Sequence, residues 1–117
     1  MKIHHRNKKY ERLIQDEKKL KCKYGEKNSR EILGSIGELE SANLLSDIPQ
    51  MIRPHALKTN GAFLIFSLDV EHPNRLLFVP IWEYDINNPL STIKEIEIVE
   101  LSVNTHDHKF NANRYNL

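Results

Sequence analysis

Apolar residues recur at helical spacing in the first part of the chain. From Asn7 onward, Tyr10, Leu13, Leu20 and Tyr24 fall near one face at the 3.6-residue period, and Lys and Glu fill most positions between them. The following run, KYGEKNS, contains a Gly and an Asn, which interrupt a helical pattern. The spacing therefore predicts a first amphipathic helix that ends near Tyr24.

A second apolar stripe follows this break. Ser29 is a suitable N-cap for the helix, and the stripe extends to Ala42 and Asn43. Its earlier members are Ile32, Leu33, Ile36 and Leu39. Two amphipathic helices joined by a short break predict an antiparallel helical hairpin.

The period changes to two after Pro54. In AFLIFSLDV (62–70) the even-numbered residues are all apolar, whereas the odd-numbered ones become polar toward the end. RLLFV (75–79) follows after a four-residue link, so the two runs predict a β-hairpin whose even-numbered residues face the core. IKEIEIVELSV (93–103) is the last predicted strand. Its apolar phase shifts between Ile98 and Val99, which indicates a bulge or burial on both faces.

The order of these elements predicts the fold class. KIHHR (2–6) is a candidate for a short N-terminal strand, and the segment between Ile81 and Thr92 is a polar, turn-rich insertion. We therefore expect a two-layer α+β domain, in which an N-terminal helical hairpin packs on a mainly antiparallel sheet of four or five strands. The 117 residues fit one domain, expected over residues 1–107, with a polar tail over 108–117 that forms a loop or short irregular cap.

Charge is distributed unevenly along the chain. Residues 1–30 hold 11 of the 17 Lys and Arg residues but only 4 of the 16 acidic ones. A basic block of this kind suits a phosphate-rich partner, and it is equally compatible with a solvated, lysine-rich helix face.

The cysteine content and the apolar runs bear on the compartment. The single cysteine, Cys22, excludes an internal disulfide and fits a reducing environment. No apolar run approaches the ~18–20 residues of a membrane span, and the N-terminus has no apolar core of a secretory signal. We therefore expect a cytoplasmic protein that does not contact the membrane.

Four segments, in their order and spacing, resemble the RelE/ParE superfamily of bacterial toxins, and most closely its HigB-type branch. The resemblance covers residues 2–107. The segments are LKCKYG (20–25), ELESANLLSDIP (38–49), HALK (55–58) and DVEHPNRLLF (69–78).

The resemblance implies a RelE-like fold, with two N-terminal helices on a twisted sheet of four or five strands. It implies the toxin of a type II toxin–antitoxin system, a ribosome-dependent mRNA endonuclease that inhibits translation and uses no metal or other cofactor. The implied partners are mRNA, the 70S ribosome and a cognate antitoxin of helix-turn-helix type. Other members of the superfamily do not cut RNA, so the alternative is a non-catalytic relative, either a gyrase inhibitor or an antitoxin-binding module.

Metal-free RNA cleavage uses the 2′-hydroxyl of the RNA as the nucleophile. The site then needs a base, an acid and a cation for the phosphoryl oxygens. The resemblance assigns Arg75 to the scissile phosphate, Lys58 to a phosphate contact, and His55 and His106 to acid, base or RNA contacts. Further RNA contacts are expected from Arg53, Lys8, Lys9, Lys18 and Lys19.

Structural interpretations of the same residues stand beside these roles. Arg75 is alternatively a strand-end residue paired with Asp69 or Glu71, and His55 and Lys58 are alternatively an ordinary exposed pair. His72 is assigned a structural role in the hairpin turn. The histidine pairs at 4–5 and 106–108 lack the Cys/His spacing of a zinc site, so no metal site is expected.

Two departures from the family pattern affect the expected site. Asn104 and Thr105 stand where HigB-type members carry an acidic residue and a tyrosine, which removes a stacking or proton-transfer group. Tyr115, in the tail, is the candidate substitute. The turn KTNGAF (58–63) carries no charge after its Lys, so attraction of phosphate depends more on the remaining cations.

Overall fold

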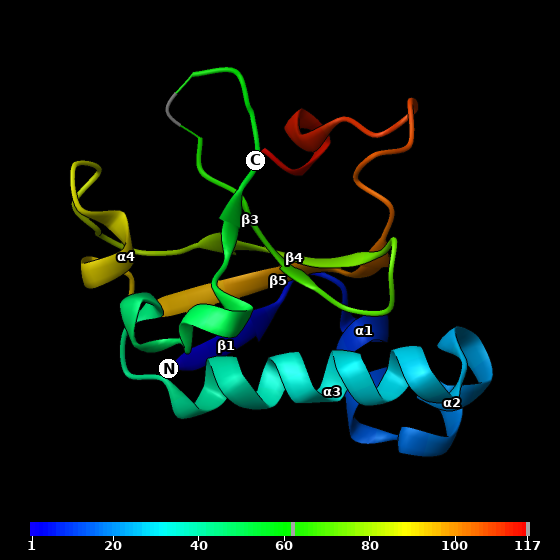
Figure 1. The fold of residues 1–117 in the computed structure, drawn as a ribbon. Helices are drawn as coiled ribbons and strands as arrows, with labels where there is room; N and C mark the ends of the chain where they lie inside the picture. Colours follow the sequence, from blue (N-terminus) through cyan, green and yellow to red (C-terminus); the bar gives the residue numbers. More distant parts are fainter. Residues whose placement is uncertain (62, 117) are drawn as a thin grey trace.

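A helical layer covers one face of a five-stranded sheet in the computed structural model, which describes residues 1–61 and 63–116 (Figure 1). The strand order is β1-β5-β4-β3-β2. β1 runs parallel to β5 and the other three pairings are antiparallel, so the α+β class is confirmed and the sheet is mixed. The strands are β1 (Lys2–His5), β2 (His55–Ala56), β3 (Phe66–Asp69), β4 (Arg75–Pro80) and β5 (Glu95–Val103).

The helical layer contains three helices, whereas the sequence predicted two. They are α1 (Lys8–Gln15), α2 (Glu17–Tyr24) and α3 (Glu26–Ser41); α4 (Pro89–Thr92) lies in the later insertion, and η1 (Leu45–Asp47), η2 (Gln50–Ile52) and η3 (Ala112–Tyr115) are short 3-10 turns. In the described part of the chain, every helix lacks the combination of length and apolar character that crossing a bilayer requires.

Local hydrogen bonds explain why the helix boundaries differ from the prediction. Asp16 leaves the helical conformation, and its carboxylate caps α2 by accepting from the backbone N–H of Lys19. The predicted first helix is therefore two helices. α3 begins at Glu26, after Gly25, so the predicted N-cap at Ser29 is wrong: Ser29 lies inside the helix and its hydroxyl donates to the carbonyl of Glu26.

The main core lies between the helices and the sheet. As predicted, the even-numbered residues of the β3–β4 hairpin face this core, and Phe66 stacks on Phe78 with ring centroids 5.8 Å apart. The bulge predicted near Val99 is also present, because the β4–β5 register shifts between Leu77 and Phe78. The buried set from the sheet is Phe66, Leu68, Val70, Leu76, Phe78, Ile96, Ile98 and Leu101, and from the helices Leu20, Ile32, Ile36 and Leu39.

The face of the sheet away from the helices, here the second face, carries a smaller core. Ile65, Leu77, Val79 and Val99 are buried there beneath Ala112 and Tyr115 of the C-terminal segment (residues 104–116). This segment runs back over the sheet in Figure 1, drawn in orange and red. The tail is thus the irregular cap that the sequence left as one option, and it buries apolar side chains although its composition is polar.

Two groups of polar contacts hold the C-terminal segment. Arg6 pairs with Glu97 at 2.7–2.8 Å and donates from Nη1 to the carbonyl oxygen of Tyr115. The carboxylate of Glu100 accepts from the hydroxyls of Tyr115 (3.1 Å) and Tyr10 (3.0 Å). The segment is therefore attached to Arg6, which follows β1, and to Glu100 of β5, whose carboxylate also binds Tyr10 of α1.

The tyrosine pair predicts a loss of stability in alkali. Burial, followed by the negative charge of Glu100, raises the pKa of Tyr10 and of Tyr115 above the ordinary value of about 10. An unfolded chain loses these protons first, so their contribution to stability is present below about pH 10 and is lost as the pH rises through the raised folded-state pKa.

We expect the unfolding free energy of the wild type, measured in urea, to fall above pH 10. Tyr115→Phe should show a smaller fall. At pH 7 this variant should be less stable than the wild type by about 1 kcal/mol, because it lacks the hydrogen bond to Glu100. Tyr84→Phe, outside the Glu100 contacts, is the matched control and should keep the wild-type pH dependence. An unchanged alkaline decline in Tyr115→Phe would contradict this account.

The glycines of α3 provide a second stability test. A Cβ built on Gly34 or Gly37 meets nothing within 4 Å, so Gly34→Ala and Gly37→Ala should each stabilise the protein by roughly 0.4–1 kcal/mol through helix propensity. Gly25→Ala should destabilise it, because Gly25 has a φ of +84°. Thermal unfolding measures all three, and a lower melting temperature in Gly34→Ala or Gly37→Ala would show that α3 is more closely packed.

Candidate active site

Arg75 is the first residue of β4 and lies on the second face. Its neighbours Leu76 and Phe78 point into the main core, so alternation turns the guanidinium away from the helices. In the sheet, Arg75 pairs with Asp69 of β3 on one side and with Val103 of β5 on the other. The charge therefore does not compete with core packing, as the sequence predicted.

The guanidinium of Arg75 has two protein partners. Its Nε lies 3.1 Å from Oδ1 of Asp69, and its Nη1 lies 3.4 Å from the hydroxyl of Ser67. Ser67 is fully buried, and its hydroxyl lies 3.4 Å from the carbonyl oxygen of His55 on β2. These contacts hold the guanidinium in place and leave other N–H donors of its fork for an anion. The pair with Asp69 is the contact that the structural interpretation of Arg75 expected.

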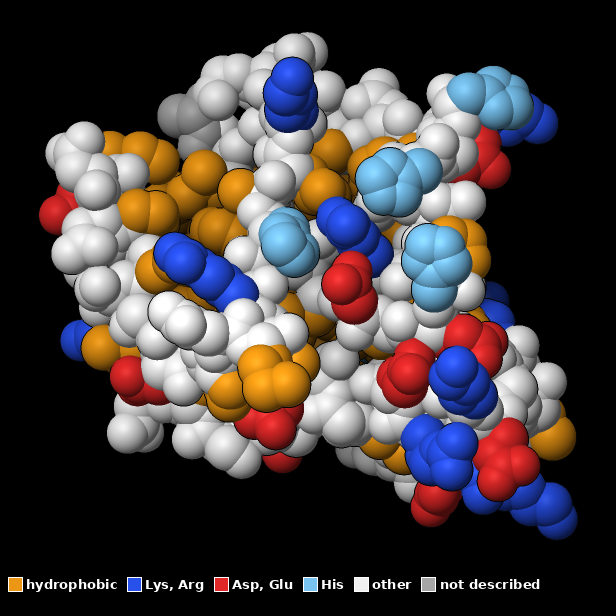
Figure 2. Space-filling model, viewed as in Figure 1, with side chains coloured by type: hydrophobic (Ala, Val, Ile, Leu, Met, Phe, Trp, Pro, Cys, Tyr) orange, Lys and Arg blue, Asp and Glu red, His pale blue; other side chains and the backbone are white. Residues whose placement is uncertain are grey.

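Arg75 lines a hollow of about 290 Å³, here the Arg75 hollow, at one end of the sheet. On the side of the molecule that Figure 2 shows, histidine side chains gather around a basic and an acidic side chain. The volume lies close to the lower limit of the range for ligand sites, ~300–1,000 Å³, and leaves room for a phosphate group. The lining residues are Asp69, Val70, His72, Pro73, Asn74, Arg75 and His106.

His106 reaches the hollow through a tight turn that follows β5. The side-chain oxygen of Asn104 accepts the backbone N–H of His106 at 3.0 Å, which is the hydrogen bond of an Asx-turn. Asn104 thus has a structural role in directing His106. The sequence analysis did not predict this role. An Asn at the end of a predicted strand is nevertheless typical of an Asx-turn, in which its side chain accepts from the N–H two residues later.

Two other predicted residues lie outside the lining of the hollow. His55 is exposed on β2, and only its backbone is joined to Arg75, by way of Ser67. Lys58 is exposed beyond the end of β2. Tyr115, the candidate substitute from the tail, does not line the hollow, and its hydroxyl is bonded to Glu100.

The predicted RNA-binding cations are distributed over other parts of the surface. Arg53 follows η2 and lines a separate hollow of about 200 Å³. The lysines belong to α1 and α2, in the layer on the opposite face of the sheet from Arg75, so the structure does not bring them to the Arg75 hollow. They are Lys8, Lys9, Lys18 and Lys19.

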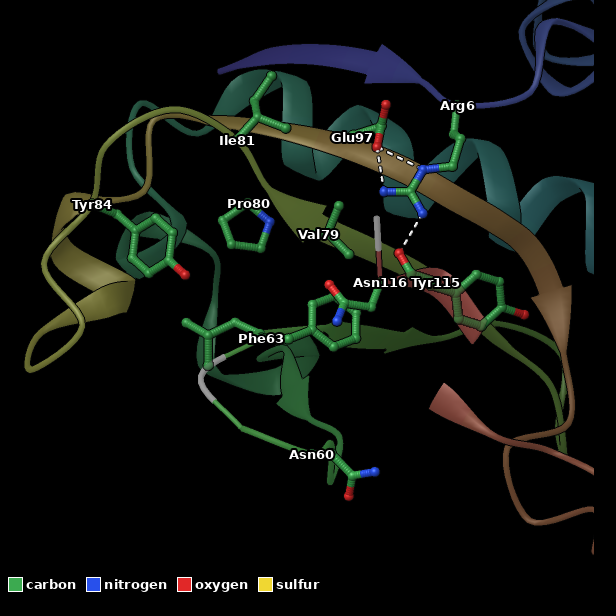
Figure 3. Close-up of a pocket in the computed structure, with 11 residues that line it drawn as sticks. Arg6, Asn60, Phe63, Val79, Pro80, Ile81, Tyr84, Glu97, Tyr115 and Asn116 are labelled. Atoms are coloured by element: carbon green, nitrogen blue, oxygen red, sulfur yellow. Dashed lines mark hydrogen bonds and ion pairs between the residues drawn. The ribbon is translucent and has the colours of Figure 1, made fainter. Parts of the chain in front are cut away.

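Another hollow, of about 390 Å³, lies on the second face of the sheet, away from the helices (Figure 3). Arg6 forms one wall, but Glu97 and the Tyr115 carbonyl occupy its guanidinium. Phe63, Tyr84 and neighbouring apolar residues form the rest of the lining. Its residues come from segments far apart in the sequence, so no local pattern signalled it, and its paired charges make it a poor site for an anion.

Three other histidines, His4, His5 and His108, lie outside the lining of the Arg75 hollow. His4 pairs with Glu95 at 2.9 Å and His108 with Asp107 at 3.5 Å. Burial lowers the pKa of His5, and its Nε2 is buried without a hydrogen-bond partner among the described residues. Within residues 1–61 and 63–116, no three His, Cys, Asp or Glu side chains are grouped so that they could hold a metal ion.

The candidate site was also compared with known proteins. The comparisons with protein-family models, with curated proteins and with solved structures found no match. The assignment of function therefore depends on the chemistry of the chain itself. Its central feature is the guanidinium of Arg75, which is paired with Asp69 and lines a hollow together with His72 and His106.

Proposed function

We propose that this protein is the toxin of a type II toxin–antitoxin system, a HigB-like member of the RelE/ParE superfamily that cleaves mRNA on the ribosome. The observation that carries the proposal is the guanidinium of Arg75, held by Asp69 and Ser67 in a hollow that it shares with His106. N-terminal helices on one face of a five-stranded sheet also support the RelE-like arrangement that the sequence segments suggest.

The proposed reaction is a metal-independent transesterification. The 2′-hydroxyl loses its proton to a base as its oxygen bonds to the adjacent phosphorus, and the 5′-oxygen leaves with a proton from an acid. Arg75 binds the non-bridging oxygens and stabilises the charge that develops on them. His106 exchanges one of the two protons, because an imidazole ring can act either as an acid or as a base.

The other expected residues act outside the hollow. His55 and Lys58, exposed on and just beyond β2, contact the RNA next to the cleaved bond, and Arg53 extends the cationic surface. The ribosome positions the mRNA in its A site and so supplies much of the orientation that an isolated nuclease must build for itself. The reaction takes place in the cytoplasm, and a helix-turn-helix antitoxin silences it by covering the Arg75 hollow.

A non-catalytic relative is the second candidate function. The Asp69 carboxylate already partners Arg75, and Asn104 and Thr105 replace an acidic residue and a tyrosine of the family pattern. Both observations favour a protein that binds a partner, either an antitoxin or gyrase, without cutting RNA. The measurement below separates the two functions.

Arg75→Ala and His106→Ala should each lower mRNA cleavage on programmed ribosomes by about 100-fold or more, because each removes a group that acts in the transition state. Arg75→Lys should retain part of the activity, since it keeps the charge but loses the planar fork. Cells that express either alanine variant without antitoxin should grow, whereas the wild type arrests them.

Arg30→Ala and His108→Ala are the matched controls, because both residues are exposed and lie outside the hollow lining. Circular dichroism and thermal unfolding should show that all the variants fold. Full cleavage by both Arg75→Ala and His106→Ala would reject the site. Growth arrest by the wild type with intact mRNA would reject the nuclease in favour of the binding function.

A further inference from the structure

The Arg75 hollow contains a histidine that the chemistry above does not use. His72 lines it together with Asp69, Arg75 and His106. We propose that His72 is a second acid–base residue of this site, acting with His106 on an RNA phosphodiester bound by Arg75. This inference rests on the proposed function and adds a catalytic residue to it.

The backbone around His72 is held more firmly than an ordinary exposed turn. Val70 and Asn74 are joined by a backbone hydrogen bond of 3.2 Å, and Asn74 donates to the carbonyl of Glu71 at 2.8 Å. The N–H of Glu71 donates to the side chain of Asn28, which is buried in α3. His72 is thus presented at a defined place by contacts that do not involve its own side chain.

Asn28 also connects this turn to the strand that leads to His106. Its Nδ2 donates to the hydroxyl of Ser102 on β5 at 2.9 Å. The turn that carries His72 and the end of β5 are therefore tied to the same buried amide.

The imidazole of His72 is available for proton transfer. It is exposed, and among the described residues no hydrogen bond or ion pair to its ring is found. His4 and His108, by contrast, are paired with Glu95 and Asp107. A turn of this kind is ordinarily built from Asn, Asp, Gly or Ser, so the turn alone does not require an imidazole.

The two histidines approach Arg75 from different segments. His72 comes from the β3–β4 turn, and His106 comes from the turn that follows β5, while β4 with Arg75 lies between β3 and β5. In-line displacement at phosphorus sets the attacking and leaving oxygens on opposite sides. Two imidazoles that line the hollow from separate segments can serve the two oxygens, which one imidazole cannot do within a single step.

The step is balanced with these two residues. The neutral imidazole takes the 2′-hydroxyl proton as the O2′–P bond forms, and the imidazolium gives a proton to O5′ as the P–O5′ bond breaks. The products are a 2′,3′-cyclic phosphate and a 5′-hydroxyl, with no net uptake of protons. The charged groups around the pair are Arg75 and Asp69 in the hollow, Glu71 beside His72, and Asp107 beside His106.

The test uses His72→Asn and His72→Gln in the ribosome-dependent cleavage assay over pH 5–9. His72→Asn keeps a turn-forming side chain but cannot exchange a proton. If the role of His72 were only structural, this variant would therefore keep the wild-type cleavage rate. We expect cleavage by both variants to fall by about 100-fold or more. We also expect the bell-shaped pH profile of the wild type to lose one limb. His108→Gln, the matched control, should keep the wild-type rate and profile.

A binding measurement separates this inference from the proposed function. Inorganic phosphate titrated into the wild type should shift the ring resonances of both His72 and His106, and not those of His108, in NMR spectra. Wild-type rate and profile in His72→Asn would overturn the inference and leave the nuclease standing. Absence of cleavage by the wild type would overturn both. A His72 ring that phosphate leaves unmoved would also overturn the inference.

Discussion

Burial of the second face of the sheet is the constraint on which the rest of this structure depends. The helices cover only one face, and Ile65, Leu77, Val79 and Val99 on the other face need a cover of their own. The C-terminal segment provides it with Ala112 and Tyr115. Because that segment must turn sharply after β5 to run back over the sheet, the same chain path that completes the core also brings His106 beside Arg75.

The electrostatic character of the site follows from where this cover stops. At the start of β4 the second face is no longer sealed, so Arg75 stands half-buried at the rim, its side chain 22% exposed. There it is partly desolvated, which strengthens its attraction for an anion, yet a ligand can still reach it. Asp69 is far more exposed, at 69%, so water screens its charge and leaves part of the attraction of Arg75 for an anion.

Patterns within short segments made several features predictable. Two-residue alternation identified the β3–β4 hairpin and its inward face, and it placed Arg75 opposite Leu76 and Phe78. The phase shift at Val99 identified the bulge. The helix boundaries were less predictable. The break at Asp16 depends on its side-chain cap, and the start of α3 at Glu26 depends on the left-handed conformation of Gly25. At both places a continued helix competes closely with the break. The basic block and the helical layer that carries it were predictable from the sequence, but the position of that block on the opposite face of the sheet from Arg75 was not.

The sequence by itself determined the α+β class, the helical and strand faces, and the orientation of Arg75, because each depends on the repeat of neighbouring residues. The tertiary structure decided the parallel pairing of β1 with β5, the packing of the polar tail on the second face, and the grouping of His72 and His106 around Arg75. These features join residues that are far apart along the chain. They are set by which surfaces remain to be buried once the helices have docked, and no local pattern records that outcome.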